Sequence, residues 1–437
     1  MENHDVEQAL RSLRGELQAE LTDDILPFWM TVGRDRDGGF YGAIDNDNVA
    51  DRFAERSAVM IARHLWTYSA AARVVARDPY LPVATAAARY LRERVWDLRY
   101  GGVYWSVTAD GRPLDRKKQV YAQAFAIYAL AEQSRATLDP EPFRMAFELF
   151  VLLELHARDP RFGGYVEARA HDWSEVPASR LSSVDLVCEK SMNTNLHVLE
   201  ALTNLLRAAM LFAPGGRISG NPECARIASA LSDQIRTMEN RVLQPDGHLG
   251  LFFTLDWSRL EQKISFGHDI EASWLIVEAR EVAGEYYRDV NGPAAVPNGH
   301  TKEQFALSAA ETVPALSLAE ATLREGFDVE HGGIYDECED GEIDPCRIWW
   351  CQAEAIVGFV SAYQMTGREE YAGAALSTWS FVRRHLLDRA GGEWFWGVTG
   401  TGSLLPGYPK GGNWKTGYHA GRACMEIMRR VDAAPAY

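Results

Sequence analysis

The chain has 437 residues, of which 47% are hydrophobic and 24% are charged, and both fractions are ordinary for a globular protein. Its formal net charge of −16 disfavours a nucleic acid partner, because binding to a phosphate backbone requires a basic surface. The six cysteines lack the paired short spacing of zinc fingers, and the first residues lack the apolar core of a signal peptide. No apolar run reaches membrane-spanning length, so we expect a cytoplasmic protein without a membrane segment.

Amphipathic segments alternate with glycine-centred turns along the whole chain. The hydrophobic periodicity predicts helices at about 6–32, 54–77, 80–96, 118–136, 141–157, 191–212, 223–241, 268–289, 303–325, 350–366, 369–387 and 417–431. Glycines followed by aromatic or apolar residues recur at 38–41, 101–105, 163–166, 247–249, 332–335 and 391–396. Strand signals are confined to brief segments around these glycines, such as 103–107 and 249–253.

A helix, a glycine hairpin and a second helix, repeated six times, predict an all-α fold of the (α/α)6 type. This fold is a toroid barrel of twelve helices with short β-hairpins at one end. A linear helical solenoid is the alternative, but its repeats are usually shorter and carry no hairpin. The Gly/Pro-rich segments 214–222 and 291–302 are expected to be loops away from the hairpins. Because no low-complexity linker divides the chain, we expect residues 1–437 to form a single domain.

If the barrel closes, the helices that follow the hairpins all begin at the same end and surround one pocket. Their first turns carry histidines, carboxylates, an arginine and tryptophans: Arg63, Tyr121, Asn193, His197, His268, Glu271, Trp349, Trp350, Glu354, Trp414 and His419. A single buried histidine or tryptophan is more often a core residue than a site residue. The convergence of these residues at equivalent repeat positions favours a polar site.

The segment 265–274 carries the clearest candidate for an acid–base pair. His268 and Glu271 are three residues apart, so both lie on one side of a predicted helix start. A nearby carboxylate supports a charged imidazole, which suits acid–base chemistry, although a helix cap with a buried polar pair is an alternative. The same spacing occurs in metal sites. Because the chain has no cysteine cluster, we expect no metal.

These residues resemble the N-acylglucosamine 2-epimerase superfamily and, within it, the cellobiose 2-epimerases. The matching segments are 62–66, 101–105, 120–128, 191–200, 265–274, 349–355, 392–394 and 414–422. The resemblance implies an (α/α)6 barrel and a cofactor-free enzyme. Such an enzyme interconverts the glucose and mannose configurations at the reducing end of β-1,4-linked disaccharides such as cellobiose and lactose. We expect a disaccharide or monosaccharide as the binding partner, and a monomer or weak homodimer.

The resemblance also implies roles for individual residues. His268 and His419 look like the acid/base pair, with Glu271 supporting His268, and His197 and Arg63 look like hydrogen-bonding groups at the reacting end. The expected substrate-binding residues are Tyr121, Asn193, Trp349, Trp350, Glu354 and Trp414, with Trp350 and Trp414 as sugar-stacking walls. Two positions depart from the family pattern: Asn195, where the family usually has His, and Ala420, where it has Asn. Both are expected to touch the reacting region.

The chemistry of these residues leads to the same reaction class. Opening the sugar ring lets the C1 carbonyl acidify the C2 proton, so a histidine can remove it and leave a cis-enediolate. Reprotonation on the opposite face inverts C2, while Arg63 stabilises charge on the carbonyl oxygen. The alternatives are a mannose or related aldose–ketose isomerase, a glycoside hydrolase with two carboxylates across the glycosidic bond, and a toroid that binds sugar without catalysis.

Overall fold

The structure is a computed structural model that describes residues 3–182, 184–291 and 308–432. Its first helix runs continuously through α1 (Asn3–Ala19), a π-helical turn (Glu20–Ile25) and α2 (Leu26–Thr31). The π-turn precedes Pro27, which has no N–H to donate to the helix ladder. The predicted helix at 6–32 therefore exists, with a local widening that its hydrophobic pattern does not reveal.

The described residues contain eleven further α-helices in chain order. They are α3 (Ala58–Val74), α4 (Arg77–Tyr90), α5 (Val120–Thr137), α6 (Pro140–His156), α7 (Met192–Leu211), α8 (Pro222–Thr237), α9 (Phe266–Asn291), α10 (Ala309–Ala321), α11 (Trp349–Thr366), α12 (Glu369–His385) and α13 (Tyr418–Asp432). Single π-turns at Leu91–Val95, Met238–Val242 and Thr322–Gly326 extend α4, α8 and α10. Each predicted helix is present, although the first residues of the one predicted at 303–325 lie outside the described residues.

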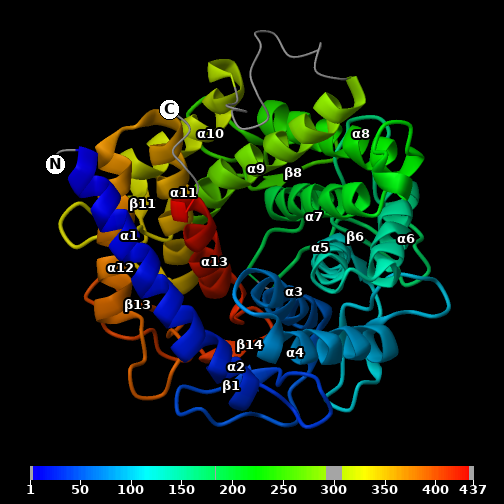
Figure 1. The fold of residues 1–437 in the computed structure, drawn as a ribbon, viewed down its shortest axis with the longest axis horizontal. Coiled ribbons are helices and arrows are strands. Elements are labelled where there is room, and N and C mark those ends of the chain that lie inside the picture. The colour runs from blue at the N-terminus through cyan, green and yellow to red at the C-terminus, as the bar shows by residue number, and fades with distance from the viewer. Residues whose placement is uncertain (1–2, 183, 292–307, 433–437) are drawn as a thin grey trace.

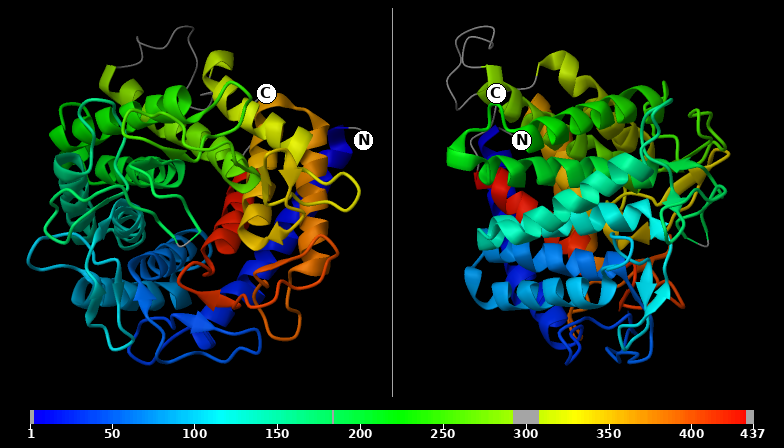
Figure 2. Two further views of the ribbon diagram at one scale, coloured as in Figure 1. Left: turned by 180° about the vertical axis from the view of Figure 1, so that it is seen from behind. Right: turned by 90° about the vertical axis from the view of Figure 1, so that its right-hand side faces the viewer.

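The helices form two concentric rings (Figure 1). The inner ring consists of α3, α5, α7, α9, α11 and α13, each in contact with the next, and α13 also contacts α3 and so closes the ring. The first helix and α4, α6, α8, α10 and α12 lie outside it (Figure 2). The predicted twelve-helix toroid is therefore confirmed for the described residues.

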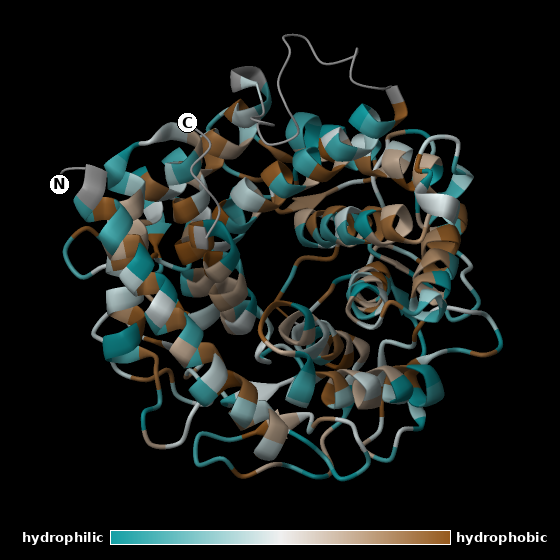
Figure 3. Ribbon diagram, viewed as in Figure 1, coloured by the Kyte–Doolittle hydropathy of each residue, from teal (hydrophilic) through white to brown (hydrophobic). Residues whose placement is uncertain are grey.

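Sequence pattern decides which ring a helix joins. The inner helix α5 is buried on all sides from Val120 to Ser134, because its alanines, aromatics and aliphatics contact neighbours all round. The outer helix α8 instead buries a stripe that includes Ile227 and Leu231 and exposes its other face. Figure 3 shows this mixture of hydrophobic and hydrophilic residues along the outer helices.

Short strands join the six units at one end of the barrel. They are β1 (Ala43–Ile44), β2 (Arg56–Ser57), β3 (Ser106–Val107), β4 (Pro113–Asp115), β5 (Lys118–Gln119), β6 (Ala168–Arg169), β7 (Lys190–Ser191), β8 (Phe252–Phe253), β9 (Ile264–Ser265), β10 (Glu337–Glu339), β11 (Glu342–Ile343), β12 (Arg347–Ile348), β13 (Gly397–Val398) and β14 (Gly411–Gly412). Each glycine turn is closed by an antiparallel bridge, such as Trp96 to Val103.

The strands pair mainly between units rather than within one hairpin. The strand before each inner helix pairs with the segment after the next glycine turn, as β5 with β6 and β7 with β8. The pair β1–β14 joins the first unit to the last. The predicted strands at 103–107 and 249–253 are thus shorter than expected, because only β3 and β8 find a partner strand there.

An ion pair with a buried cation stands behind five of the six glycine turns. An aspartate that follows the outer helix contacts a cation just before the next inner helix: Asp35 with Arg56, Asp97 with Lys118, Asp159 with Lys190, Asp328 with Arg347 and Asp388 with Lys410. Burying these cations is tolerable because each has an aspartate partner. In the fourth unit the corresponding positions hold Gln244 and Ile264, so this pair is replaced there.

The two predicted Gly/Pro-rich loops have different outcomes. Residues 214–221 contain one 3-10 turn (Pro214–Gly216) and lead into α8, whose N-cap Asn221 accepts two backbone N–H groups. The second loop, 291–302, falls almost wholly outside the described residues. Among the described helices, none has both the length and the apolar character that crossing a membrane would need.

Candidate active site

A cavity of about 440 Å³ lies at the end of the barrel where the inner helices begin. Its walls include all the predicted site residues except one: Arg63, Tyr121, Asn193, His197, His268, Glu271, Trp349, Trp350, Trp414 and His419. The exception, Glu354, is buried directly behind this lining and holds His419. The structure thus brings together residues that lie more than 350 positions apart in the chain.

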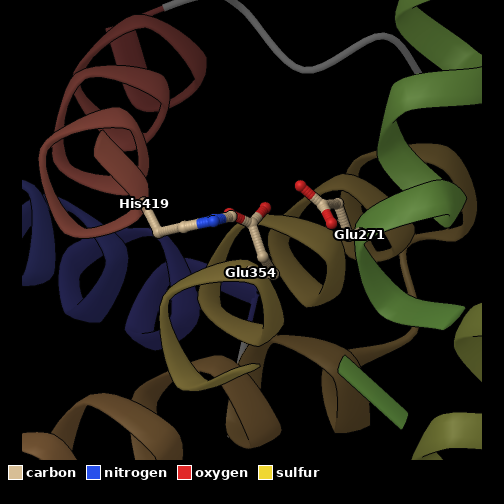
Figure 4. A group of neighbouring side chains, drawn as sticks. All are labelled: Glu271, Glu354 and His419. Atoms are coloured by element: carbon tan, nitrogen blue, oxygen red, sulfur yellow. The ribbon is translucent and has the colours of Figure 1, made fainter. Parts of the chain in front are cut away.

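His419 and two carboxylates meet in the barrel interior (Figure 4). His419 Nδ1 lies 2.7 Å from Glu354 Oε1, and Trp274 Nε1 donates to the other oxygen of Glu354 over 3.0 Å. Figure 4 shows the imidazole of His419 pointing at Glu354, with Glu271 beside them. Glu354 is therefore better described as the residue that orients His419 than as a direct sugar contact.

Arg422 neutralises the acids at the base of the cavity. It lies one helical turn after His419, and its guanidinium donates to Glu200, Glu271 and Glu354. All four side chains are about 1% exposed, so each charge depends on the others for compensation. The helical spacing of 419 and 422 suggests a shared face, but the partners of Arg422 become clear only in the closed ring.

The cavity wall also includes Arg63, Tyr121 and His197. Arg63 donates to the Trp414 carbonyl over 2.7 Å and to the Tyr121 hydroxyl over 2.9 Å, and its guanidinium lies over the Phe125 ring. His197 Nδ1 lies 2.8 Å from Glu200 Oε2. The guanidinium of Arg63 and the imidazole of His197 are thus held in position before any substrate binds, as electrostatic stabilisation requires.

His268 is held differently from the predicted pairing with Glu271. Its Nδ1 lies 2.8 Å from Ser265 Oγ, and its ring packs against Trp350 with 4.6 Å between the ring centroids. Glu271 instead accepts from Arg422. The direct pairing of Glu271 with His268 that the sequence suggested is therefore not formed, because each side chain has another partner.

Burial shifts the ionisation of these groups. It lowers the pKa of His268 to about 3 and, together with the charges of Arg63 and Arg422, lowers the pKa of His419 well below its ordinary value. Burial and the neighbouring Glu354 raise the pKa of Glu271 to about 7. Both histidines are accordingly neutral at neutral pH, the form that can accept a proton.

The two positions that depart from the family pattern do not line the cavity. Asn195 is fully buried, accepts from the backbone N–H of Tyr165 and donates to its carbonyl. Ala420 is also fully buried. The expectation that both touch the reacting region was therefore wrong, since the side chain of Asn195 secures a glycine turn.

The cavity also has walls that the sequence patterns missed. They are Leu181, Ser182, Val184, Asp185, Ser265, Asp336, Glu337, Ile348, Trp396 and Tyr408. Asp336 follows the fifth glycine turn, and burial and Glu337 raise the pKa of its carboxyl to about 7. Cys351 Sγ lies 3.5 Å from Asp336 Oδ1. The position of Asp336 after a glycine turn is the one sequence signal that could have identified it as a wall of the cavity.

A second cavity of about 310 Å³ adjoins the first. The two share walls that include Asp185, Asn193, Ser265, His268 and Glu337. Further residues of the second cavity are acidic or apolar, such as Glu261 and Phe252, and Lys263 supplies a cation. The polar space beside His268 therefore extends beyond the pocket that the histidines enclose.

Three of the site residues, Glu271, Glu354 and His419, are of types that can bind a metal ion. One ligand atom from each of Glu271, Glu354 and His419 lies within 4.8 Å of the others. Two of the three, Glu271 and Glu354, already accept from the Arg422 guanidinium. This cation meets the negative charge that would otherwise attract a metal ion.

Comparison with known proteins identifies the family. The family model described as N-acylglucosamine 2-epimerase (GlcNAc 2-epimerase) matches residues 39–423. The chain belongs to this family. The resemblance expected from the sequence motifs is thereby confirmed.

Members of this family match the chain over nearly its full length. The cellobiose 2-epimerase of Bacteroides fragilis is 39% identical over 95% of this chain and 98% of its own. The solved cellobiose 2-epimerase of Spirochaeta thermophila has a TM-score of 0.82 at 40% identity and covers 97% of both chains. A D-mannose isomerase of Marinomonas mediterranea is more distant, at 23% identity over 93% of this chain and 95% of its own.

Proposed function

We propose that this protein is a cellobiose 2-epimerase. It would reversibly convert the reducing-end glucose of β-1,4-linked disaccharides, such as cellobiose and lactose, to mannose. Relatives that are 39% and 40% identical carry this name. The observation that carries the proposal is that His268 and His419 line one cavity and are both held through Nδ1, so Nε2 of each ring can serve the substrate.

The proposed reaction follows from these positions. After ring opening, a neutral histidine accepts the C2 proton on Nε2, and the electron pair left behind forms the cis-enediolate. The second histidine takes up a proton from solvent on Nε2 and delivers it to the opposite face of C2, and the first ring releases the abstracted proton to solvent before the next turnover. The negative charge of the enediolate raises the proton affinity of both rings, which burial otherwise lowers.

Arg63 and His197 are proposed to bind the oxygens at the reacting end. Arg63 is held by Trp414 and Tyr121, so its guanidinium needs no reorganisation when charge develops on the carbonyl oxygen. Glu271, with its raised pKa, is proposed to bind a sugar hydroxyl. Trp349, Trp350 and Trp414 offer apolar faces for the sugar rings, and Tyr121 and Asn193 offer polar groups.

Two other activities remain to be separated from this one. A mannose or related aldose–ketose isomerase would reprotonate the same enediolate at C1, and the distant D-mannose isomerase favours this second candidate. Glycoside hydrolysis needs two free carboxylates across the bond. Glu271 and Glu354 both accept from Arg422, which does not suit that chemistry.

We also propose how the protein is organised. All six units, residues 1–437, would act as one domain, because the site draws residues from every inner helix. The epimerase would work without a cofactor, as a cytoplasmic monomer or weak homodimer. These proposals rest on the family resemblance, and sedimentation of the purified chain would measure its oligomeric state.

The deciding experiment follows protons at C2. The purified protein is incubated with cellobiose, and separately with mannose, in heavy water, and the products are followed by proton NMR. Deuterium at C2 together with glucosyl-mannose would support the 2-epimerase. Ketose from mannose alone would assign an isomerase. The absence of exchange with both sugars would contradict either enzyme and leave a sugar-binding toroid.

A further inference from the structure

Three inner helices secure the preceding glycine turn with a neutral amide. In each, the fourth residue of the helix accepts the backbone N–H and donates to the carbonyl of the residue that follows the second glycine. Gln123 does so with Val103, Asn195 with Tyr165 and Gln352 with Ile334, over 2.8 to 3.0 Å. A neutral amide makes this connection at any pH.

Glycine is required beside each amide. A Cβ atom at Gly102 would lie 2.8 Å from Gln123 Oε1, one at Gly164 2.9 Å from Asn195 Oδ1, and one at Gly333 2.6 Å from Gln352 Oε1. All three glycines have a positive φ. The same arrangement of amide and glycine therefore recurs in the second, third and fifth units of this chain.

The fourth unit replaces both partners with ionisable residues. Asp269 occupies the fourth position of α9, and His248 occupies the position of the second glycine. Asp269 Oδ1 accepts from the Leu249 backbone over 2.9 Å, and its other oxygen lies 2.7 Å from His248 Nδ1. His248 Nε2 lies 3.1 Å from Glu325. We call the side chains of His248, Asp269 and Glu325 the His248 clamp.

The clamp secures the unit that carries His268. Asp269 directly follows His268, so the carboxylate that ties α9 to its glycine turn also fixes the backbone at His268. The imidazole of His268 has Ser265 Oγ as its hydrogen-bond partner. The fourth unit is also the one in which Gln244 and Ile264 replace the Asp–cation pair, so the clamp provides the charged contact there.

We propose that His248, Asp269 and Glu325 form an ionisable clamp that positions His268. The proposal rests on the proposed epimerase function, in which His268 transfers the C2 proton. His248 and Asp269 are positioning residues, since they act through the start of α9. Where the other units use a pH-independent amide, this unit uses a contact whose strength depends on protonation.

The direction of the pH effect follows from the donors. A protonated His248 ring has two N–H groups and donates to both Asp269 and Glu325, whereas the neutral ring has one. Burial alone would lower the pKa of His248, but Asp269 and Glu325 outweigh it and raise the pKa above its ordinary value. The other charged groups nearby are Asp246, which accepts the His248 backbone N–H, and Arg324, which pairs with Glu325.

The clamp is therefore complete below the ordinary histidine pKa of about 6.5 and loses one donor as pH rises through the higher pKa of folded His248.

The test is the pH profile of C2 deuterium exchange with cellobiose in heavy water. In His248→Gln we expect kcat at about pH 6 to fall several-fold with a smaller change in KM. In the wild type we expect kcat to decline at high pH as the clamp loses this donor. In His248→Gln we expect this decline to be absent.

Two further variants separate positioning from general stability. The double variant His248→Gly/Asp269→Asn installs the neutral pair of the other units, and we expect activity without the His248-dependent decline even if His248→Gln folds poorly. His171→Gln is the matched control, because His171 also contacts a buried aspartate, Asp97 at 2.8 Å, far from His268 in sequence. An unchanged pH profile in both clamp variants would overturn the proposal.

The outcome remains readable if the proposed function fails. If the wild type exchanges neither cellobiose nor mannose, the function is wrong but the clamp can still be tested by NMR of the labelled His268 imidazole. We expect His248→Gln to shift that resonance and abolish its response to the titration of His248, whereas His171→Gln leaves both unchanged. A His268 resonance that is the same in His248→Gln and the wild type would contradict the clamp.

Discussion

His419 Nδ1 and Arg422 Nη2 meet at the same oxygen of Glu354, each at 2.7 Å. A single buried carboxylate oxygen thus orients the proposed acid/base histidine and binds the cation that neutralises the site. The other oxygen of Glu354 accepts from Trp274, so both are engaged. Changes at Glu354 are expected to affect chemistry and stability together.

Glu354→Gln tests this double role. The amide can present one oxygen but must direct an NH2 group at another donor, either Trp274 Nε1 or the pair His419 and Arg422. We expect a loss of about 1–3 kcal/mol in the free energy of unfolding, because a buried donor is left unsatisfied. Urea denaturation measures this loss, and C2 exchange measures the accompanying fall in kcat. An unaltered kcat would show that His419 does not need this carboxylate.

His268→Ala and His419→Ala test the proton transfer itself. Removing a general acid or base typically costs a factor of about 10² to 10⁴, and we expect each variant to lose C2 exchange by at least that range. Heavy-water NMR with cellobiose measures the loss, while circular dichroism confirms the fold. Near-normal turnover in either variant would remove that histidine from the mechanism.

Arg422→Met tests the charge balance under the cavity. It leaves Glu200, Glu271 and Glu354 buried without their shared cation, and breaking a buried ion pair in this way costs about 3–5 kcal/mol. Arg11→Met on α1 is the control, because its exposed pair with Glu7 is expected to contribute less than about 1 kcal/mol. Equal losses in the two variants would contradict the assigned role of Arg422.

His64→Leu tests a pH dependence away from the cavity. His64 stacks on Phe40 at 3.7 Å, both its ring nitrogens lack a hydrogen-bond partner within the described residues, and burial lowers its pKa to about 3. The unfolded chain therefore binds one more proton between about pH 3 and 6.5, so stability rises with pH there by up to about 1.4 kcal/mol per pH unit. Urea denaturation at several pH values should show a shallower dependence in the variant. An unchanged slope would mean that His64 is protonated in the folded state.

Asp336→Asn tests a cavity wall that the sequence patterns did not reveal. Asp336 lines the cavity, and above its pKa of about 7 its carboxylate can accept from two sugar hydroxyls, whereas the amide accepts with one oxygen only. We expect KM for cellobiose to rise about tenfold, equivalent to about 1.4 kcal/mol, with a smaller change in kcat. Steady-state kinetics with cellobiose measures both constants. A fall in kcat alone would assign Asp336 to the chemical step instead.

The sequence predicts those features that repeat. Glycine turns at fixed places in each unit, followed by helices that are apolar on all sides, determine the ring of helices, and the predicted helix at 118–136 agrees closely with α5 at Val120–Thr137. The contact between Ser265 and His268 could also have been inferred, because the residues lie three apart at a helix start.

Contacts between distant units could not be predicted in this way. Glu271 binds Arg422, which lies 151 positions further along the chain, and this pairing exists only in the closed ring. The cavity walls Ser182 and Asp185 come from a loop with no periodic pattern. Asn195 illustrates the opposite error. It lies within a motif and was expected to touch the reacting region, but its side chain secures the backbone of a turn.

The pairing of β1 with β14 has a consequence for how the protein folds. Closing the ring joins residues more than 350 positions apart, as does the bond from Arg63 to Trp414, and such high contact order slows folding. During synthesis the acids Glu200, Glu271 and Glu354 leave the ribosome long before Arg422 does. Ring closure, neutralisation of these acids and the appearance of activity are therefore expected to occur in one late kinetic step.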